Sequence, residues 1–210
     1  MFRTASLSLL VAALATPILA QKSLQGFSTA GERTESNHLV ITMENGKFAG
    51  IAGAAFLSYV PAKWSPALND EAKIDQLTKG HLFRLGMNNW ATLDNYAPIS
   101  FGNVTVPAGI WYLGIARDTE GSKWTLVFVD PAKAKAAGAT PPMADSAPRT
   151  HEVPLTIEKV KETCEKMAVT LTKDEKDPVK GTLSIAFGNL KTSIAYELKI
   201  APVAEAAGKK

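Results

Sequence analysis

The sequence predicts an all-β domain, folded as a single antiparallel β-sandwich or a partly open barrel with one or two short helices in its loops. Most of the chain consists of short segments in which apolar and polar residues alternate, which is the period of a strand with one buried face. Turn residues separate these segments at hairpin spacing, and stretches with helical spacing are few. Because the connections are too short to hold crossover helices, a purely parallel sheet is excluded.

The first predicted element is a β-hairpin. Residues 39–43 alternate between apolar and polar side chains, and Asn45-Gly46 is the strongest short signal for a two-residue hairpin turn. The apolar run over 48–60 continues as the returning strand. Its glycines, at 50 and 53, indicate close strand packing or a β-bulge, because no helical pattern follows them as it would after a phosphate-binding loop.

A loop with one short helix is predicted over residues 61–80. Prolines interrupt its first part, and the spacing of Ile74 and Leu77 then predicts a helix over 71–77. Asn69 or Asp70 would cap this helix. Trp64 lies on the same loop, and an aromatic residue in such a place either closes a pocket or pins the loop to the sheet.

The core of the domain is expected in the hairpin over residues 110–130. Strands are predicted over 101–106, 110–117 and 123–130, joined by a turn at Pro107-Ala108-Gly109 and a loop at 118–122. The last two of these strands are apolar on both faces. Such strands belong in the middle of a layered fold.

The second half of the chain continues with β-patterns after one change of composition. Residues 131–149 are rich in Ala and Pro, which predicts a short helix ending at Gly138 and then an irregular loop. Alternation resumes afterwards, and Gly188-Asn189 is expected to turn the chain between the last two strands. The strands predicted here cover residues 153–160, 166–172, 181–187 and 190–200, which brings the total to eight or nine.

The first twenty residues of the chain indicate export. Residues 1–20 combine Arg3, an apolar run and small residues ending at Ala20, as a cleavable secretory signal peptide does. Residues 21–36 are expected to be flexible, 37–200 to form the β-sandwich, and 201–210 to be a disordered tail. No later segment is apolar for long enough to span a bilayer. We therefore expect an exported protein, periplasmic or extracellular.

Charge and cysteine content exclude some classes of protein. The chain has 23 Lys and Arg against 20 Asp and Glu, for a formal net charge of +3. Its most charged stretch, residues 158–180, alternates in sign and lacks the aromatic residues that stack on bases, which argues against a nucleic-acid partner. Cys164 is the only cysteine, so the chain cannot form an internal disulfide.

Familiar catalytic and metal motifs are missing from the sequence. It contains no Gly-x-Ser-x-Gly, His-Glu-x-x-His, Cys-x-x-Cys or P-loop pattern. Its three histidines, at 38, 81 and 151, lie far apart and have no partner at metal-ligand spacing. We therefore assign no catalytic residue, no metal and no cofactor from the sequence.

A cluster of polar residues between 84 and 94 is the best candidate for a ligand site. On an extended chain, Arg84, Asn88 and Thr92 would project on the same side. Arg supplies a planar fork of donors for a carboxylate or phosphate, and Asn and Thr supply adaptable donors and acceptors. The alternative is that Arg84 pairs with a buried acid while the asparagines satisfy turn backbone groups. The candidate ligand-binding residues are Arg84, Asn88, Asn89, Thr92, Asp94 and Trp64.

Three phrases carry a resemblance to a known family. Residues 84–88 read Arg-Leu-Gly-Met-Asn, residues 91–92 read Ala-Thr, and residues 106–113 read Val-Pro-Ala-Gly-Ile-Trp-Tyr-Leu. They resemble the core motifs of domain-of-unknown-function family 2911, whose members are mostly exported bacterial proteins without an established activity. The resemblance extends over about residues 55–200 and implies the fold type and export, but no reaction. Phe83 stands where members commonly have Trp, and the segment before it departs from the family pattern.

Three functions are compatible with these observations. The first is a non-catalytic exported β-domain that binds a small anionic or sugar-like ligand. The second is an enzyme acting on an envelope or extracellular substrate, with Arg84 as electrophilic clamp and Asp94 or His81 as acid or base. That enzyme needs Asp94 or His81 to face the same pocket as Arg84. The third is a structural protein-interaction module, which would expose an apolar patch or an unpaired strand edge.

Overall fold

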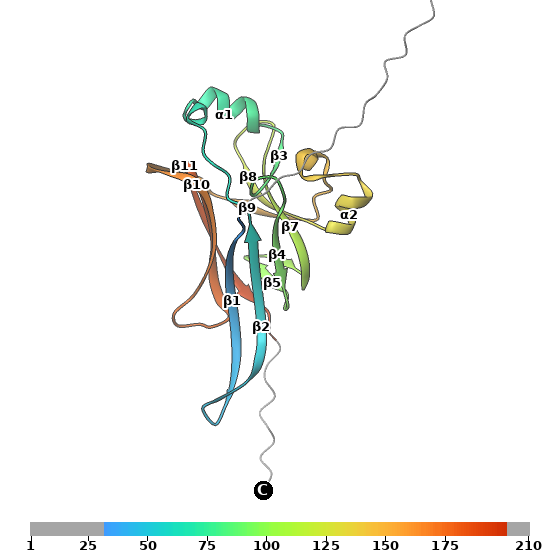
Figure 1. The fold of residues 1–210 in the computed structure, drawn as a ribbon, viewed down its shortest axis with the longest axis vertical. Coiled ribbons are helices and arrows are strands. Elements are labelled where there is room, and N and C mark those ends of the chain that lie inside the picture. The colour runs from blue at the N-terminus through green and yellow to red at the C-terminus, as the bar shows by residue number, and fades with distance from the viewer. Residues whose placement is uncertain (1–31, 201–210) are drawn as a thin grey trace, which may run out of the picture. The chain divides into compact units, whose positions relative to one another are not determined.

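Two antiparallel sheets face each other in the computed structural model, which describes residues 32–200 (Figure 1). The larger sheet has the order β1-β2-β4-β7-β8-β9, with β3 pairing to β7, and the smaller has the order β10-β11-β5-β6. The larger sheet contains β1 (Thr34–Glu44), β2 (Lys47–Tyr59), β3 (Leu82–Arg84), β4 (Ala91–Asn95), β7 (Gly109–Arg117), β8 (Trp124–Val129) and β9 (His151–Leu155). The smaller contains β5 (Ile99–Phe101), β6 (Val104–Val106), β10 (Glu158–Lys173) and β11 (Lys180–Leu198). The predicted all-β sandwich is confirmed, and the sheets do not close into a barrel.

The main core fills the space between the two sheets. The β7–β8 hairpin lies near the middle of the larger sheet, as its two apolar faces predicted, and Leu113, Leu126 and Phe128 are fully buried there. Phe101 and Leu183 face them from the smaller sheet. Burial of each such side chain stabilises the fold by roughly 1.5–3 kcal/mol.

A second, smaller core lies on the outer face of the larger sheet. Helix α2 (Pro131–Ala136) and the 3-10 segment η2 (Pro141–Ser146) cover this face. The side chains packed there are Leu82, Trp90, Ala116, Val127 and Val129 from the sheet side, and Ala134, Ala139, Ala144 and Ala147 from the cover. The Ala- and Pro-rich stretch therefore forms a third layer over one part of the sandwich.

The two predicted helices begin at side-chain caps. Asp70 accepts a hydrogen bond from the backbone N of Ala72 at 2.9 Å and so begins helix α1 (Glu71–Thr78), which lies at one end of the sandwich (Figure 1). Asp130 caps α2 in the same way, and Gly138, with φ +67°, follows the end of α2 as predicted. A short 3-10 segment, η1 (Pro66–Asn69), precedes α1.

The β1–β2 hairpin confirms the turn predicted at Asn45-Gly46, and β1 begins at Thr34, before the expected boundary at 37. Register shifts occur after Val40 and after Thr42, opposite the glycine-containing part of β2. One face of this hairpin carries exposed apolar side chains, which we call the apolar stripe. The stripe consists of Leu39, Ile41, Met43, Phe48 and Ile51, which are 45 to 64% exposed.

The turn predicted at Gly188-Asn189 is wrong, because β11 runs unbroken through both residues. Gly188 has φ +60° and pairs with Cys164 at a register shift, so its left-handed backbone makes a bulge instead of reversing the chain. The single strand predicted over 153–160 is also wrong, since β9 ends at Leu155 and a separate strand, β10, begins at Glu158. Residues 32–200 contain eleven strands, whereas eight or nine were predicted.

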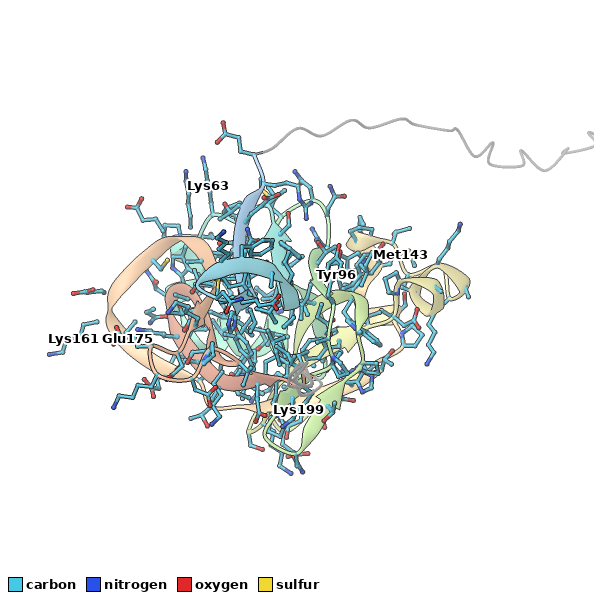
Figure 2. All side chains as sticks on the ribbon, turned by 90° about the horizontal axis from the view of Figure 1, so that it is seen from below. Lys63, Tyr96, Met143, Lys161, Glu175 and Lys199 are labelled. Carbon is cyan, nitrogen blue, oxygen red and sulfur yellow. The ribbon has the colours of Figure 1, made fainter. Side chains whose placement is uncertain are left out.

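The long β10–β11 pair presents a charged outer side. Lys161 of β10 and Glu175 of the connecting turn project away from the packed interior in the view of Figure 2, and both are exposed. This agrees with the alternation of charges in the sequence over 158–180.

Some expectations from the sequence concern residues outside the range that the structure describes. The signal peptide at 1–20, most of the flexible segment at 21–36 and the tail at 201–210 lie outside residues 32–200. Within that range, no helix has the length and apolar character needed to cross a membrane.

Candidate functional site

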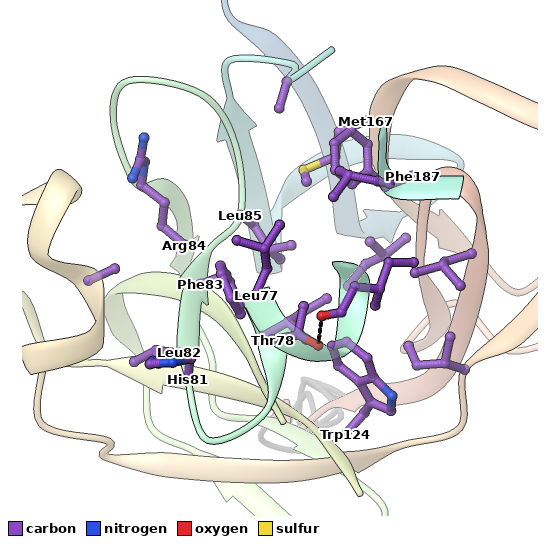
Figure 3. A pocket seen from close by; sticks show the side chains of 18 of the residues that line it. Leu77, Thr78, His81, Leu82, Phe83, Arg84, Leu85, Trp124, Met167 and Phe187 are labelled. Atoms are coloured by element: carbon purple, nitrogen blue, oxygen red, sulfur yellow. Dashed lines mark hydrogen bonds between the residues drawn. The ribbon is translucent and has the colours of Figure 1, made fainter. Parts of the chain in front are cut away.

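A cavity of about 590 Å³ lies between the two sheets at the end where α1 is placed. Both sheets and α1 contribute to its wall, so the cavity exists only in the assembled fold. Figure 3 shows Leu77 and Thr78 of α1 facing the side chains of Leu85, Trp124 and Phe187. The larger sheet also contributes Phe83 of β3 and Ile115 of β7, and the smaller sheet contributes Met167, Ile185 and Leu190. Apolar side chains thus form most of the wall.

One continuous stretch of chain forms about half of this wall. It runs from Ala62 to Gly86 and includes η1, α1 and β3. Helix α1 contains no buried residue, and Leu77 remains 47% exposed although it lines the cavity. The helix therefore covers the cavity without being packed into the core.

Arg117 of β7 holds α1 in place. Its Nη1 donates to Oδ1 of Asp75 at 2.6 Å and to Oγ1 of Thr78 at 3.0 Å, and its guanidinium also donates to the carbonyl of Gly121. The same guanidinium lies 4.9 Å from the ring centroid of Trp124, a cavity residue. Hydrogen bonds from Lys79 and then from Arg117 hold the pKa of Asp75 below its usual value.

Trp64 lines the cavity, which agrees with one of the two roles predicted for it, that of closing a pocket. Its ring packs edge-on against Phe187, with centroids 5.0 Å apart, and its Nε1 donates to Oδ1 of Asn69 at 3.0 Å. The ring also covers Gly188, where an added Cβ would lie only 2.2 Å from it. The bulge in β11 therefore makes the space that Trp64 occupies.

Polar groups border the cavity at few points. At its rim, Nδ1 of His81 lies 2.7 Å from Oδ2 of Asp145, and Oδ1 of Asp145 accepts from the backbone N of Leu82 at 2.8 Å. The His81 hydrogen bond is the foremost reason that the pKa of Asp145 lies below its usual value. Both side chains are about half exposed, at 50% and 52%, so this pair marks the solvent side of the cavity.

Among the polar residues that line the cavity, Thr192 of β11 is the most buried. Thr192 is 4% exposed and its Oγ1 has no hydrogen-bond partner among the described residues. Sequence reasoning did not select Thr192. A signal was present, because Thr192 lies two residues before Ile194 and four before Tyr196, and therefore on the same side of the strand predicted over 190–200.

Arg84 borders the cavity, but its guanidinium lies on the opposite side of β3 from Phe83 and Leu85 (Figure 3). There Nη1 donates to the carbonyl of Pro141 at 2.7 Å, while Nε is buried without a partner. Burial lowers the pKa of this guanidinium from its usual value. Within residues 32–200 Arg84 has no ion-pair partner, so the buried acid of the alternative prediction is not found there.

The expectation that Arg84, Asn88 and Thr92 share one side of an extended chain is wrong. Gly86 has φ +97° and Asn88 has φ +65°, and these left-handed residues turn the chain between β3 and β4. Asn88 therefore lies on a turn. The position of Asn88 on a turn agrees with the alternative prediction, whereas hydrogen bonding of turn backbone groups by its side chain stays a prediction.

Thr92, Asn89 and Asp94 lie on or near the outer face of the larger sheet, away from the cavity. Thr92 and Asn89 border an outer depression of about 600 Å³ together with Arg33 and Lys135, beside the stacked rings of Trp90 and Tyr112. Asp94 pairs in register with Phe56 and Ile110 and lines neither this depression nor the cavity. Of the six predicted site residues, Arg84 and Trp64 thus border the cavity, Asn89 and Thr92 border the outer depression, and Asn88 and Asp94 border neither.

A metal centre is not assembled from the described part of the chain. Over residues 32–200 no group of three or more His, Cys, Asp or Glu side chains is placed to hold a metal ion. His38 is buried near Tyr196, whereas His151 packs against Trp111. The three histidines therefore have three separate surroundings.

Comparisons with known proteins found no relative of this chain. No protein-family model, no curated protein and no solved structure matches the chain.

Proposed function

We propose that this protein binds a predominantly apolar small molecule in the cavity between its sheets and does not transform it. The observation that carries the proposal is the cavity itself, whose volume of about 590 Å³ is lined mainly by apolar and aromatic side chains. Small-molecule sites typically occupy roughly 300–1,000 Å³ and combine apolar walls with a few placed polar groups. Unfilled apolar volume costs stability, so a ligand that fills it would stabilise the fold.

The apolar wall favours a ligand class different from the anionic or sugar-like one expected from the sequence. An anion in this cavity would lose its hydration without gaining a buried cationic partner, because the guanidinium of Arg84 lies on the other side of β3 and Lys191, which also lines the cavity, is exposed to solvent. A sugar would leave most of its hydroxyls unpaired against Leu, Ile and Phe side chains. The outer depression with Arg33 and Lys135 is the better place for an anion.

The competing enzyme hypothesis has weaker support. It needs Arg84 and either Asp94 or His81 to face one pocket, and Asp94 lies on the outer face of β4. The remaining candidate is the exposed His81–Asp145 pair at the rim. A binding function uses the whole apolar wall, whereas this catalytic one would use a single pair.

We further propose export to the periplasm or the extracellular space and kinship with family 2911. The features that support export are the charged start, apolar run and small residues of 1–20. Kinship is supported by the phrases at 84–88, 91–92 and 106–113.

The test is a titration of the purified protein with N-phenyl-1-naphthylamine, an apolar probe whose fluorescence rises in apolar surroundings. We expect saturable binding of one probe per chain. Leu77→Trp places a large ring at the cavity mouth and should weaken binding at least tenfold. Ala72→Trp is the matched control, because Ala72 is exposed on the same helix and does not line the cavity. Binding that does not saturate, or that is equal in the two variants, would overturn the proposal.

A further inference from the structure

A row of side chains crosses three strands of the larger sheet at the outer depression. Ser58 of β2 pairs in register with Thr92 of β4, and Thr92 pairs in register with Tyr112 of β7. Thr92 and Tyr112 both line the depression and are half-buried. The ring of Tyr112 stacks on that of Trp90, with centroids 5.4 Å apart and an angle of 3° between the planes. One end of the row is therefore a pair of parallel aromatic rings.

Arg33 lies over the other end of this row. Its Nε donates to Oγ of Ser58 at 2.7 Å, and its Nη2 donates to the carbonyl of the same residue at 2.8 Å. Nη2 also lies 3.5 Å from Oγ1 of Thr92, the strand neighbour of Tyr112. The guanidinium and the Tyr112 ring are thus separated by about one inter-strand distance, roughly 4.8 Å.

The charge of Arg33 is not balanced by any acid of the described chain. Its three contacts are all with neutral oxygens, and among residues 32–200 it takes part in no ion pair. A guanidinium has five N–H donors, and these contacts leave those of Nη1 unused. The sheet therefore positions this cation while leaving part of its donor fork available.

Helix α2 adds a second cation to the depression. Lys135 of α2 lines it, is exposed, and likewise forms no ion pair with a described residue. The lining contains no Asp or Glu, and Asn89 and Thr140 add further hydrogen-bonding groups. The depression thus combines positive charge, hydrogen-bonding groups and an aromatic ring.

We propose that the outer depression is a second ligand site and binds a small aromatic carboxylate. The fork of Arg33 holds the carboxylate, a planar group that matches its geometry, and Lys135 adds positive charge. The ring of the ligand packs against Tyr112. This site goes beyond the proposed function, because no residue that lines the depression also lines the cavity between the sheets.

The experiment measures binding of benzoate, acetate and benzyl alcohol to the purified protein by isothermal titration calorimetry at low ionic strength. We expect one benzoate per chain, bound at least fivefold more tightly than acetate, which lacks the ring, or benzyl alcohol, which lacks the charge. Arg33→Gln should weaken benzoate binding at least tenfold. Lys135→Gln should weaken it about threefold, as expected for one exposed charge pair. Lys133→Gln is the matched control, because Lys133 is exposed on the same helix and does not line the depression.

Two further readouts keep the site distinct from the fold and from the cavity. The midpoint of urea unfolding shows whether Arg33→Gln disturbs the contact with Ser58, and if it does, Lys135→Gln against Lys133→Gln decides. Benzoate should not displace N-phenyl-1-naphthylamine, which we expect in the cavity. Absence of saturable benzoate binding, equal affinity for benzyl alcohol, equal loss in the two lysine variants, or displacement of the probe would overturn the second site. If the probe does not bind the wild type, the proposed function fails, whereas the benzoate titrations still decide the second site.

Discussion

The hydroxyl of Tyr196 donates a hydrogen bond to Nδ1 of His38, with 2.7 Å between the two atoms, and so connects β11 to β1 across the sandwich. Nε2 of the same imidazole lies 2.8 Å from the carbonyl of Pro178. Because a carbonyl only accepts, the proton is assigned to Nε2 and the lone pair to Nδ1. Burial raises the pKa of Tyr196, which keeps its hydroxyl protonated as the donor.

Removing this hydroxyl should destabilise the fold. Tyr196→Phe leaves Nδ1 of the buried His38 without a donor, and we expect the free energy of unfolding to fall by about 1–3 kcal/mol. Urea denaturation followed by circular dichroism measures the change. Tyr96→Phe is the control, because Tyr96 is 68% exposed, and it should change the free energy by less than about 0.5 kcal/mol. Similar losses in the two variants would contradict the role given to His38.

A methyl group at Gly188 should disturb the cavity wall. Gly188→Ala puts a Cβ 2.2 Å from the ring of Trp64, which must then leave its place against Phe187. We expect lower stability, a change in tryptophan fluorescence and at least tenfold weaker probe binding.

The control for Gly188→Ala is Gly138→Ala. Gly138 has a similar left-handed backbone, φ +67° against +60°, but its Cβ would meet open space. Both variants carry the penalty of a left-handed alanine, roughly 1–2 kcal/mol, so only the difference between them reports the contact with Trp64. If Gly138→Ala weakens probe binding as much, backbone strain and not the displaced ring explains the effect.

Acid should loosen the helix that covers the cavity. Asp75 has a folded-state pKa below its usual 3.8, so its ionised form is favoured in the folded state. The contribution of ionised Asp75 to the stability of the folded state is therefore complete above about pH 3.8. It is lost as the pH falls toward the folded-state pKa of this carboxyl group. We expect the probe to dissociate faster below pH 3.8, as measured by stopped-flow fluorescence.

Asp75→Asn should release the probe fast at every pH, because the amide cannot form the ion pair with Arg117. Asp174→Asn is the control: the pKa of Asp174 is also lowered, chiefly by backbone donors, but it does not contact α1. A pH profile that is the same in the wild type and Asp75→Asn would rule out this carboxylate as the sensitive group.

The apolar stripe on the β1–β2 hairpin should promote self-association without supporting the fold. Ile41 and Ile51 pair in register and are 49% and 59% exposed. Replacing both by Thr keeps β-branched side chains, so we expect each change to alter stability by less than about 0.5 kcal/mol. Sedimentation velocity should show less concentration-dependent association. Loss of saturable probe binding in this variant would place the probe on the stripe and not in the cavity.

Local patterns in the sequence were enough to predict most strands and both helices. Asn45-Gly46 and the caps Asp70 and Asp130 act within a few residues, so their effects can be read without the rest of the chain. The turn predicted at Gly188-Asn189 was wrong because the same dipeptide can form either a turn or a β-bulge within a strand. The choice between them depends on pairing with Cys164 and on contact with Trp64, which are distant in sequence.

The candidate site was harder to predict because it depends on contacts between distant segments. One of the two roles predicted for Trp64, at a pocket, is found in the structure, but the prediction for the cluster around Arg84 assumed an extended chain, and the backbone of Gly86 and Asn88 turns it. Thr192 could be placed on an inward face from its spacing. That its hydroxyl has no partner follows only from the packing of both sheets.

The continuous stretch that forms about half of the cavity wall, residues 62–86, connects β2 with the turn before β4. The framework strands β2, β4, β7 and β8 lie outside it and pair with one another independently of it. Substitutions confined to residues 62–86 can therefore reshape the cavity while the pairing of β2, β4, β7 and β8 stays the same.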